Sequence, residues 1–312
     1  MIEAAPIART PRQRGVALVT ALLVVAIVTT LAASVGLNQQ IWLRQVQNQQ
    51  DRVQAVQVEL AALNWALAVI EQDTRTSNGT DNLGEDWAVA VPPLPVEGGL
   101  VHGAIADAQG RFNLNNLLRG TTPSAVDMAV FRRLLTELDL DPNLTEAVID
   151  WIDADGTARP GGADDMDYLR LNPPYRAANQ AFSSIEELRM VAGFDAKTVA
   201  ALRPFVTALP IATPINVNTA PVEVLSAALE LPVEQLKKLI DERRSSPLKS
   251  LSDLQTYLPS KQPVLAAGLM DFRSDFFEVE VQSSFGQLAR ASHAMVQRSG
   301  EHAVVLWQAQ QL

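Results

Sequence analysis

A cluster of aspartates lies in a short segment near the middle of the 312-residue chain, among glycines and a proline. Its six members are Asp150, Asp153, Asp155, Asp164, Asp165 and Asp167. Six carboxylates gathered in one loop would repel one another strongly without a counter-ion. A hard divalent cation removes that repulsion, and the flexible oxygen coordination of calcium suits an Asp- and Gly-rich loop better than the strict octahedron of magnesium. A solvated acidic loop without an ion is the alternative interpretation.

Other metals fit this segment poorly. The chain contains no cysteine, and its three histidines, His102, His293 and His302, lie far away in strand-like segments. Zinc, copper and iron sites would therefore lack their usual ligands. The segment is not an EF-hand either, because Ala158 stands where the glycine would fall if Asp153 opened the motif. Asn179 and Glu186, followed by Glu187, come later in the chain and are candidates to close the same site or a second one.

Catalytic motifs are absent from the sequence. Serine hydrolase chemistry requires a base beside the nucleophile, and the three histidines accompany no Gly-x-Ser-x-Gly elbow. No glycine-rich phosphate-binding loop is present. We therefore expect a protein that is not an enzyme.

One segment favours a different class of function. The stretch from Pro214 to Leu225 resembles the opening of helix-hairpin-helix DNA-binding modules, and a small basic face follows it. The basic residues are Lys237, Lys238, Arg243 and Arg244. However, the expected turn, Leu229 to Val233, lacks the glycine that brings backbone amides to a phosphate, and it carries Glu230. A net charge of -10 also provides no general attraction for DNA. We interpret the motif as a packing scaffold, with a membrane-anchored DNA-uptake protein as the alternative function.

The N-terminal region predicts a membrane-spanning helix. After Arg9, Arg12 and Arg14 the chain is apolar from Gly15 to Leu31, and no further charge appears until Arg44. About 20 apolar residues span the hydrocarbon core as a helix. The preceding arginines favour a cytoplasmic N-terminus, with the bulk of the protein on the far side of the membrane. A cleaved secretory signal is the alternative, but its apolar region is shorter, and a clear break normally follows it.

The helix is expected to continue beyond the membrane. Apolar residues recur every three or four positions, with polar residues on the other face, which is typical of an amphipathic helix. They are Val53, Val56, Leu60, Leu63, Leu67 and Ile70. The sequence therefore predicts one long helix that begins in the membrane and packs its second half against a globular domain.

Strand patterns follow this helix in two separate parts of the chain. Leu100 to Leu114 predicts a hairpin, and three further strands are expected at 276–281, 287–297 and 302–307. The interval from Thr121 to Arg273 contains helix starts instead, with capping boxes at Ser184 and Ser250. The sequence therefore predicts one antiparallel sheet packed on the long helix and interrupted by a large α-helical insertion.

The N-terminus carries a specific resemblance. A basic leader that ends in Arg14-Gly15 and runs into an uninterrupted apolar helix resembles the class III signal of type IV pilins and type II secretion pseudopilins. Prepilin peptidase cuts after that glycine in the family, which would make Val16 the new N-terminus. Most members carry a glutamate at the fifth position after the cut, where this chain has Thr20. An unpaired carboxylate is costly in a bilayer. Its absence resembles the K-type minor pseudopilins, which sit at the tip of the pseudopilus and have no subunit above them.

The resemblance implies an α+β, pilin-like fold. A long transmembrane and amphipathic N-terminal helix would pack on an antiparallel β-sheet, with an all-α insertion similar to SAM and helix-hairpin-helix domains. The implied divisions are a prepilin leader at 1–15, the transmembrane part at 16–37, the first part of the pilin-like domain at 38–120, the inserted domain at 121–273 and the C-terminal strands at 274–312.

The resemblance also implies a function. The chain would cap the periplasmic pseudopilus, help to initiate its assembly and so support export of folded proteins across the outer membrane. Implied partners are the I-, J- and H-type minor pseudopilins, the prepilin peptidase and the assembly platform of the bacterial inner membrane. The α-domain of K-type pseudopilins is stabilised by calcium, which favours calcium over a solvated loop for the run from Asp150 to Asp155.

Overall fold

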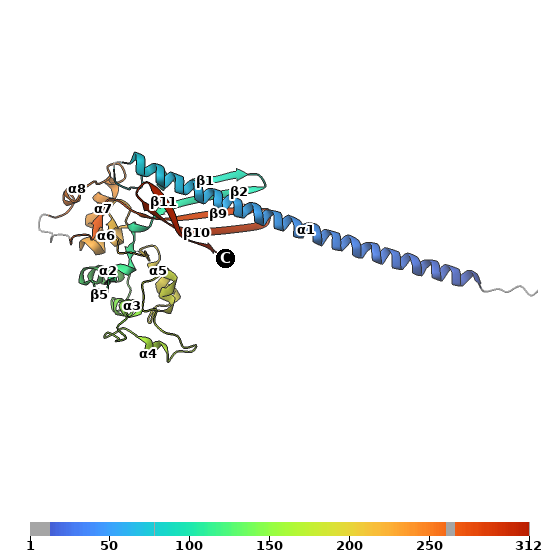
Figure 1. The fold of residues 1–312 in the computed structure, drawn as a ribbon, viewed down its shortest axis with the longest axis horizontal. Coiled ribbons are helices and arrows are strands. Elements are labelled where there is room, and N and C mark those ends of the chain that lie inside the picture. The colour runs from blue at the N-terminus through green and yellow to red at the C-terminus, as the bar shows by residue number, and fades with distance from the viewer. Residues whose placement is uncertain (1–12, 78, 260–265, 312) are drawn as a thin grey trace, which may run out of the picture.

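A single helix dominates the shape of the molecule. The computed structural model describes residues 13–77, 79–259 and 266–311. Helix α1 (Gln13–Thr76) has 64 residues, and at 1.5 Å per residue it is about 96 Å long. Its first half extends well beyond the rest of the protein, and its second half lies on the globular body (Figure 1). The predicted continuous helix is confirmed, although the leader residues before Gln13 lie outside the described part of the chain.

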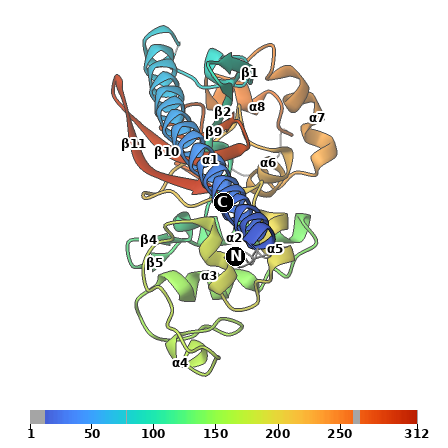
Figure 2. The ribbon, with the colours of Figure 1, turned by 90° about the vertical axis from the view of Figure 1, so that its right-hand side faces the viewer.

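A five-stranded antiparallel sheet packs under the second half of α1 (Figures 1 and 2). The strands run in the order β1-β2-β9-β10-β11. Their bounds are β1 (Val91–Val96), β2 (Gly99–Asp107), β9 (Phe276–Phe285), β10 (Leu288–Ser299) and β11 (His302–Gln311). The three predicted C-terminal strands are confirmed, and strands from before and after the helical region meet where β2 pairs with β9.

The predicted hairpin is wrong in its placement. Leu100 to Leu114 is not a hairpin, because β2 ends at Asp107 and pairs with the preceding strand β1. Strand β1 has the sequence Val-Pro-Pro-Leu-Pro-Val. Its prolines cannot donate hydrogen bonds within a sheet, so the sequence pattern argued against a strand here. The structure accommodates them because β1 lies at the edge of the sheet, with an irregular register between Val91 and Leu94.

The apolar stripe predicted on α1 is only partly buried. Leu63 and Ile70 pack against the sheet in one hydrophobic core. Val53, Val56 and Leu60, by contrast, are exposed. In this earlier part of α1, the buried positions facing the sheet are Ala55 and Glu59. The apolar residues at the start of the stripe therefore lie beside the contact between α1 and the sheet rather than in it.

Two buried ion pairs join α1 to strand β10. Glu59 accepts hydrogen bonds from Arg290, with Nε at 2.8 Å from Oε1. Farther along, Arg298 Nη1 lies 3.2 Å from Asp73 Oδ2. The 14 residues from Glu59 to Asp73 span about 21 Å of helix, and the eight from Arg290 to Arg298 about 26 Å of strand. The helix and the strand therefore run in the same direction with similar spacing between their charged contacts.

The helical region forms beside one end of the sheet and has its own core (Figure 1). Its α-helices are α2 (Ala125–Glu137), α3 (Leu144–Ile152), α4 (Asp165–Tyr168), α5 (Ala196–Leu202), α6 (Val222–Leu229), α7 (Val233–Glu242) and α8 (Leu251–Gln255). The 3-10 turns are η1 (Asp86–Ala88), η2 (Ala108–Gly110), η3 (Leu114–Leu117) and η4 (Ile185–Met190). The predicted helix starts at Ser184 and Ser250 are confirmed, since each serine caps the helix that follows it.

Short strand pairs tie the helical region together. Parallel pairs join β3 (Phe112–Asn113) to β6 (Val206–Thr207) and β7 (Ile215–Asn216) to β8 (Met270–Asp271). An antiparallel pair joins β4 (Leu118–Arg119) to β5 (Thr122–Pro123). Phe112, Leu114 and Leu117 are buried in the helical core. The chain therefore enters this core soon after β2 ends at Asp107.

Candidate functional sites: the stem helix and two acidic clusters

The first half of α1 is an apolar stem that the rest of the chain leaves uncovered. Leu18 is 65% exposed and Ile27 is 51% exposed. Among the described residues, α1 is the one helix long and apolar enough to cross a membrane. Thr20 lies within this stem, where its hydroxyl donates to the carbonyl oxygens of Val16 and Ala17, each at 3.0 Å. Its polar group is therefore satisfied inside its own helix and requires no partner chain.

An arginine neutralises part of the acidic loop. Asp150 lies in the last turn of α3 and is fully buried, and Asp153 follows the end of that helix. Arg159 Nη1 lies 2.5 Å from a carboxylate oxygen of each, and the Arg159 amide donates to Asp150 at 2.8 Å. Burial raises the pKa of Asp150, and the bonds from Arg159 oppose that rise. A guanidinium thus supplies positive charge to this pair.

Three further aspartates of the loop, Asp164, Asp165 and Asp167, organise the short helix α4. Asp164 caps it by accepting the Asp165 amide at 2.6 Å, and Asp167 accepts the Asp164 amide at 3.2 Å. The carboxylate of Asp165 accepts Arg176 Nη1 at 3.0 Å. Asp164 is 5% exposed, and its Oδ2 atom is buried without a hydrogen-bond partner. Of the six aspartates, Asp164 therefore has acceptor capacity that the protein leaves unused.

The remaining candidate ligands lie in two different places. Asp153, Asp155 and Asn179 line one cavity of about 410 Å³. Asn179 has a positive φ of 50°, and its amide donates to the carbonyl oxygen of Trp151 at 2.9 Å, so α3 holds it beside the loop. Glu186 is engaged elsewhere, in an ion pair with Arg189 at 3.1 Å and another with Arg203.

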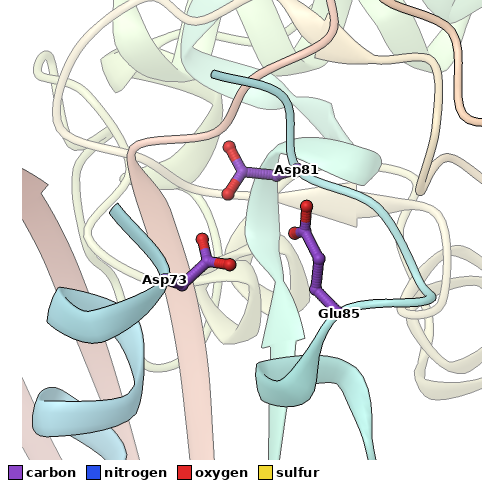
Figure 3. Close-up of side chains that lie close together, drawn as sticks. All are labelled: Asp73, Asp81 and Glu85. Carbon is purple, nitrogen blue, oxygen red and sulfur yellow. The ribbon is translucent and has the colours of Figure 1, made fainter. Parts of the chain in front are cut away.

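A second acidic cluster lies at the end of α1, and the sequence interpretation missed it. Asp73, Asp81 and Glu85 point toward a common centre (Figure 3), and one carboxylate oxygen from each lies within 4.8 Å of the other two. Among the described residues, this is the one group of three or more acidic, histidine or cysteine side chains close enough to hold a metal ion. Burial raises the pKa of Asp73 to about 7 and raises the pKa of Glu85. We call these three residues the junction triad.

Arg298 supplies positive charge to the junction triad. Besides its contact with Asp73, its Nη2 atom donates to Asp81 Oδ2 and to the carbonyl oxygen of Ser274. The Ser274 amide also donates to Asp81 Oδ2, at 2.7 Å. Asp81 Oδ1, in contrast, is buried and has no hydrogen-bond partner. The guanidinium lies over the ring of Phe277 and is almost completely buried.

The sequence does indicate a buried charge on α1 and another on β10, each from its own hydrophobic pattern. Asp73 follows the buried Ile70 by three positions, on the sheet-facing side of α1. Arg298 follows the buried Val296 by two positions, on the inward side of β10. Each pattern places a charged residue in the core. The sequence does not reveal that the two charges meet, because 225 positions separate them.

A neighbouring polar network connects the sheet to the helical region. Asp107, at the end of β2, is buried and accepts hydrogen bonds from Ser274 Oγ at 2.6 Å and Thr219 Oγ1 at 2.5 Å. Asn216 donates to Asp107 at 2.9 Å and to the carbonyl oxygen of Asp81 at 3.1 Å. The helical region is therefore attached directly beside the junction triad.

The predicted basic face of the helix-hairpin-helix segment is not intact. Arg243 is buried, and its Nη1 donates to the carbonyl oxygen of Val217 at 2.6 Å. Lys238 lies over the ring of Tyr257, 5.7 Å from its centroid. Glu230 adopts a left-handed conformation (φ 56°) where DNA-binding modules place a glycine. This geometry supports the packing interpretation and weakens the DNA-binding alternative.

Comparisons with known proteins identify the chain's family. Residues 110–211 match one family of type II secretion system protein K, and residues 215–270 match another with the same description. A type II secretion system protein K from Pseudomonas aeruginosa is 38% identical over 257 residues, which cover 79% of this chain and 77% of the relative. The chain belongs to the type II secretion system protein K family. A protein K from Pectobacterium carotovorum is 33% identical over 315 residues, 95% of each chain.

A solved structure extends the likeness to the fold. It is the crystal structure of the GspK–GspI–GspJ complex from the enterotoxigenic Escherichia coli type 2 secretion system. The match has a TM-score of 0.74 at 26% identity and covers 86% of this chain and 99% of the other. The expected pilin-like α+β fold with a helical insertion is confirmed. The chain is accordingly a minor pseudopilin, a structural component of type II secretion.

Proposed function

We propose that the protein caps the tip of a periplasmic pseudopilus and helps to initiate its assembly. The observation that carries the proposal is the uncovered apolar stem of α1, which continues without a break into a helix packed on a pilin-like sheet. A stem of this kind can pack against the stems of other subunits. The helical region adds bulk at the end of the sheet, and such bulk would clash if repeated along a tightly packed filament. A terminal position provides the space.

The stem residue Thr20 supports the same position. Pseudopilins with a glutamate at this point place a carboxylate in the membrane, where it is costly unless paired. Here the hydroxyl is satisfied by Val16 and Ala17 of its own helix. A subunit with none above it has no need of a charged group at this position.

The proposal includes processing, orientation and domain division. Prepilin peptidase cuts after Gly15, the stem from Val16 to Leu37 stays in the inner membrane, and the body from residue 38 onward lies in the periplasm. The inserted domain ends near Arg273. We place its start just after Asp107 rather than at Thr121, because Phe112 and the residues that follow it pack in the helical core.

The proposed partners are the I-, J- and H-type minor pseudopilins and the assembly platform of the inner membrane. A complex with GspI and GspJ is the setting of the solved relative. On this chain, Val53, Val56 and Leu60 form an exposed apolar stripe on α1 beyond the membrane segment, and we assign it to contact with neighbouring stems.

The partner assignment predicts the behaviour of a stripe variant. The double substitution Val56→Glu and Leu60→Glu should greatly reduce co-purification of the full chain with I- and J-type pseudopilins from detergent-solubilised membranes. Both positions are exposed, so the variant should retain its fold by circular dichroism. Gln54→Glu adds a charge at another exposed position of the same helix and is the control. Equal recovery of partners with all three proteins would contradict the assignment.

We further propose that the acidic loop holds a structural calcium ion. The fit rests on Asp164, whose buried Oδ2 has no partner in the protein. Asp153, Asp155 and Asn179 line a cavity at the same loop, and their oxygens are ligands that calcium prefers. Both side-chain oxygens already have protein partners in each of the other candidates, namely Asp150, Asp165, Asp167 and Glu186. Arg159 bonds to Asp153 through Oδ2. The narrower set is therefore the more suitable one. Calcium there would supply positive charge to the loop.

Removing the unused acceptor should weaken calcium binding. We expect excess calcium to raise the melting temperature of the full chain by several degrees, because a ligand at about 100 times its Kd stabilises by about 2.7 kcal/mol. Asp164→Asn should lose most of the rise in melting temperature that calcium binding at the loop contributes. Asp195→Asn is the control, because Asp195 is an exposed helix cap and asparagine also caps helices. An unchanged calcium response in Asp164→Asn would refute this site.

A further inference from the structure

We propose that the junction triad, Asp73, Asp81 and Glu85, is a second, separate binding site for a hard divalent cation of the calcium class. The three carboxylates come from the last turns of α1, from the loop that follows it and from the residue before η1. They converge from different directions (Figure 3). The inference rests on this geometry and is independent of the ion proposed for the acidic loop.

The first observation that points to a ligand is a buried acceptor without a donor. Asp81 is 1% exposed, and its Oδ1 atom has no hydrogen-bond partner, although Oδ2 is bonded to Arg298 and Ser274. A buried carboxylate oxygen that bonds to nothing costs free energy. One carboxylate oxygen each of Asp73 and Glu85 lies within 4.8 Å of a carboxylate oxygen of Asp81, and Asp81 Oδ1 has no protein donor that would compete with a cation placed among the three.

The charge balance is the second observation. Three carboxylates face the single guanidinium of Arg298, which leaves two negative charges when all three are ionised. Asp73 also lies in the last turn of α1, where the carbonyl ends of the helix dipole disfavour another negative charge. A divalent cation balances the two remaining charges. One proton would leave a net negative charge in the core.

The spacing of the oxygens fits a calcium-sized ion. Ligand oxygens of calcium lie about 2.3–2.6 Å from the ion, so two of them on opposite sides are about 5 Å apart. The 4.8 Å limit among the three carboxylates falls within that span. Magnesium usually retains several waters, and the nearly complete burial of Asp73 and Asp81 leaves little room for them. Oxygen-only ligation disfavours the softer transition metals.

A cation here would join three parts of the fold. Asp73 belongs to the end of α1, Asp81 is bonded to Ser274 beside the helical region, and Arg298 belongs to β10. The ion would therefore fix the end of α1 where the sheet meets the helical region. We infer that it stiffens the connection between the stem and the bulky tip domain.

The chain carries its own reporter for this site. Trp87 Nε1 donates to Glu85 Oε2 at 2.7 Å, so its indole lies next to the triad. Terbium, which substitutes for calcium, emits when an adjacent excited tryptophan transfers energy to it. We expect terbium added to chelator-stripped full chain in detergent to show emission that calcium displaces. Trp87→Phe, which leaves all three carboxylates in place, should remove the triad's share of that emission.

Two further variants separate the sites. In an Asp164→Asn background, which disables the proposed loop site, the Trp87-dependent emission should persist, and calcium should still raise the melting temperature. Adding Asp81→Asn should remove both effects. Trp87→Phe in the same background should lose the emission but retain the calcium-induced rise in melting temperature. Because this variant keeps all three carboxylates, it tests the site even if the Asp81 variant misfolds. Absence of Trp87-dependent emission, or a triad that responds to pH and not to calcium, would overturn the proposal.

Discussion

Replacing Gly15 with valine is expected to eliminate the mature protein and, with it, secretion. The reason is that prepilin peptidase must accommodate the residue before the cut, and this family presents a glycine there. Mass spectrometry of the membrane-extracted protein should find Val16 as the N-terminus of the natural chain and an intact leader on the Gly15→Val variant. A secretion assay in cells that lack the natural copy should show complete loss of export.

The matched control for this substitution is Gly36→Val. Both glycines lie in α1, and a Cβ at either position would meet nothing within 4 Å, so neither change disturbs packing within the chain. Only the Gly15 variant should escape processing. A natural mature chain that begins at any residue other than Val16, or a normally processed Gly15→Val variant, would contradict the assigned cleavage site.

Replacing Arg298 with methionine is expected to lower the free energy of unfolding by about 3–5 kcal/mol. Removing one partner of a buried ion pair leaves the other charge uncompensated, and that penalty is of this size. Here two carboxylates, Asp73 and Asp81, lose their guanidinium, and the Ser274 carbonyl loses a donor. Urea unfolding of the full chain in detergent, followed by tryptophan fluorescence, measures the change.

Two comparisons test the electrostatic origin of that loss. Arg75→Met removes an exposed ion pair with Glu301, at 3.8 Å, and should cost less than about 1 kcal/mol. Adding Asp81→Asn to Arg298→Met should recover part of the stability, because it removes one of the uncompensated charges. A further loss of stability in that double variant would show that the packing of Arg298, rather than its charge, is what matters.

The fold was largely predictable because its main elements have local signals. The apolar run after Gly15 and the spacing of Leu63 and Ile70 predict the long helix, and alternation predicts the C-terminal strands. Strand β1 was missed because its prolines are unfavourable in any strand except one at an edge. Whether a strand lies at an edge depends on its neighbours, which local sequence does not specify.

The acidic sites were predictable to a smaller extent. Aspartates close together in sequence predict an ion site in the loop from Asp150 to Asp167, yet the structure shows Arg159 bridging two of them. Local sequence does not indicate the junction triad, because its cation partner, Arg298, comes from the far end of the chain. Density of charge in the sequence is therefore a poor guide to where charge remains uncompensated in the fold.

The sequence by itself determined the long apolar N-terminal helix, the helical insertion and the family, and it predicts the processing signal at Gly15. These features rest on hydrophobic periodicity and short motifs, which act over a few turns of chain. Only the tertiary structure decided which charges are neutralised and which acceptors remain free, as at Asp81 and Asp164. The physical reason is that burial and pairing depend on which distant segments meet. In this fold the end of α1 contacts β10, and the whole insertion lies between them in the sequence, after β2 and before β9.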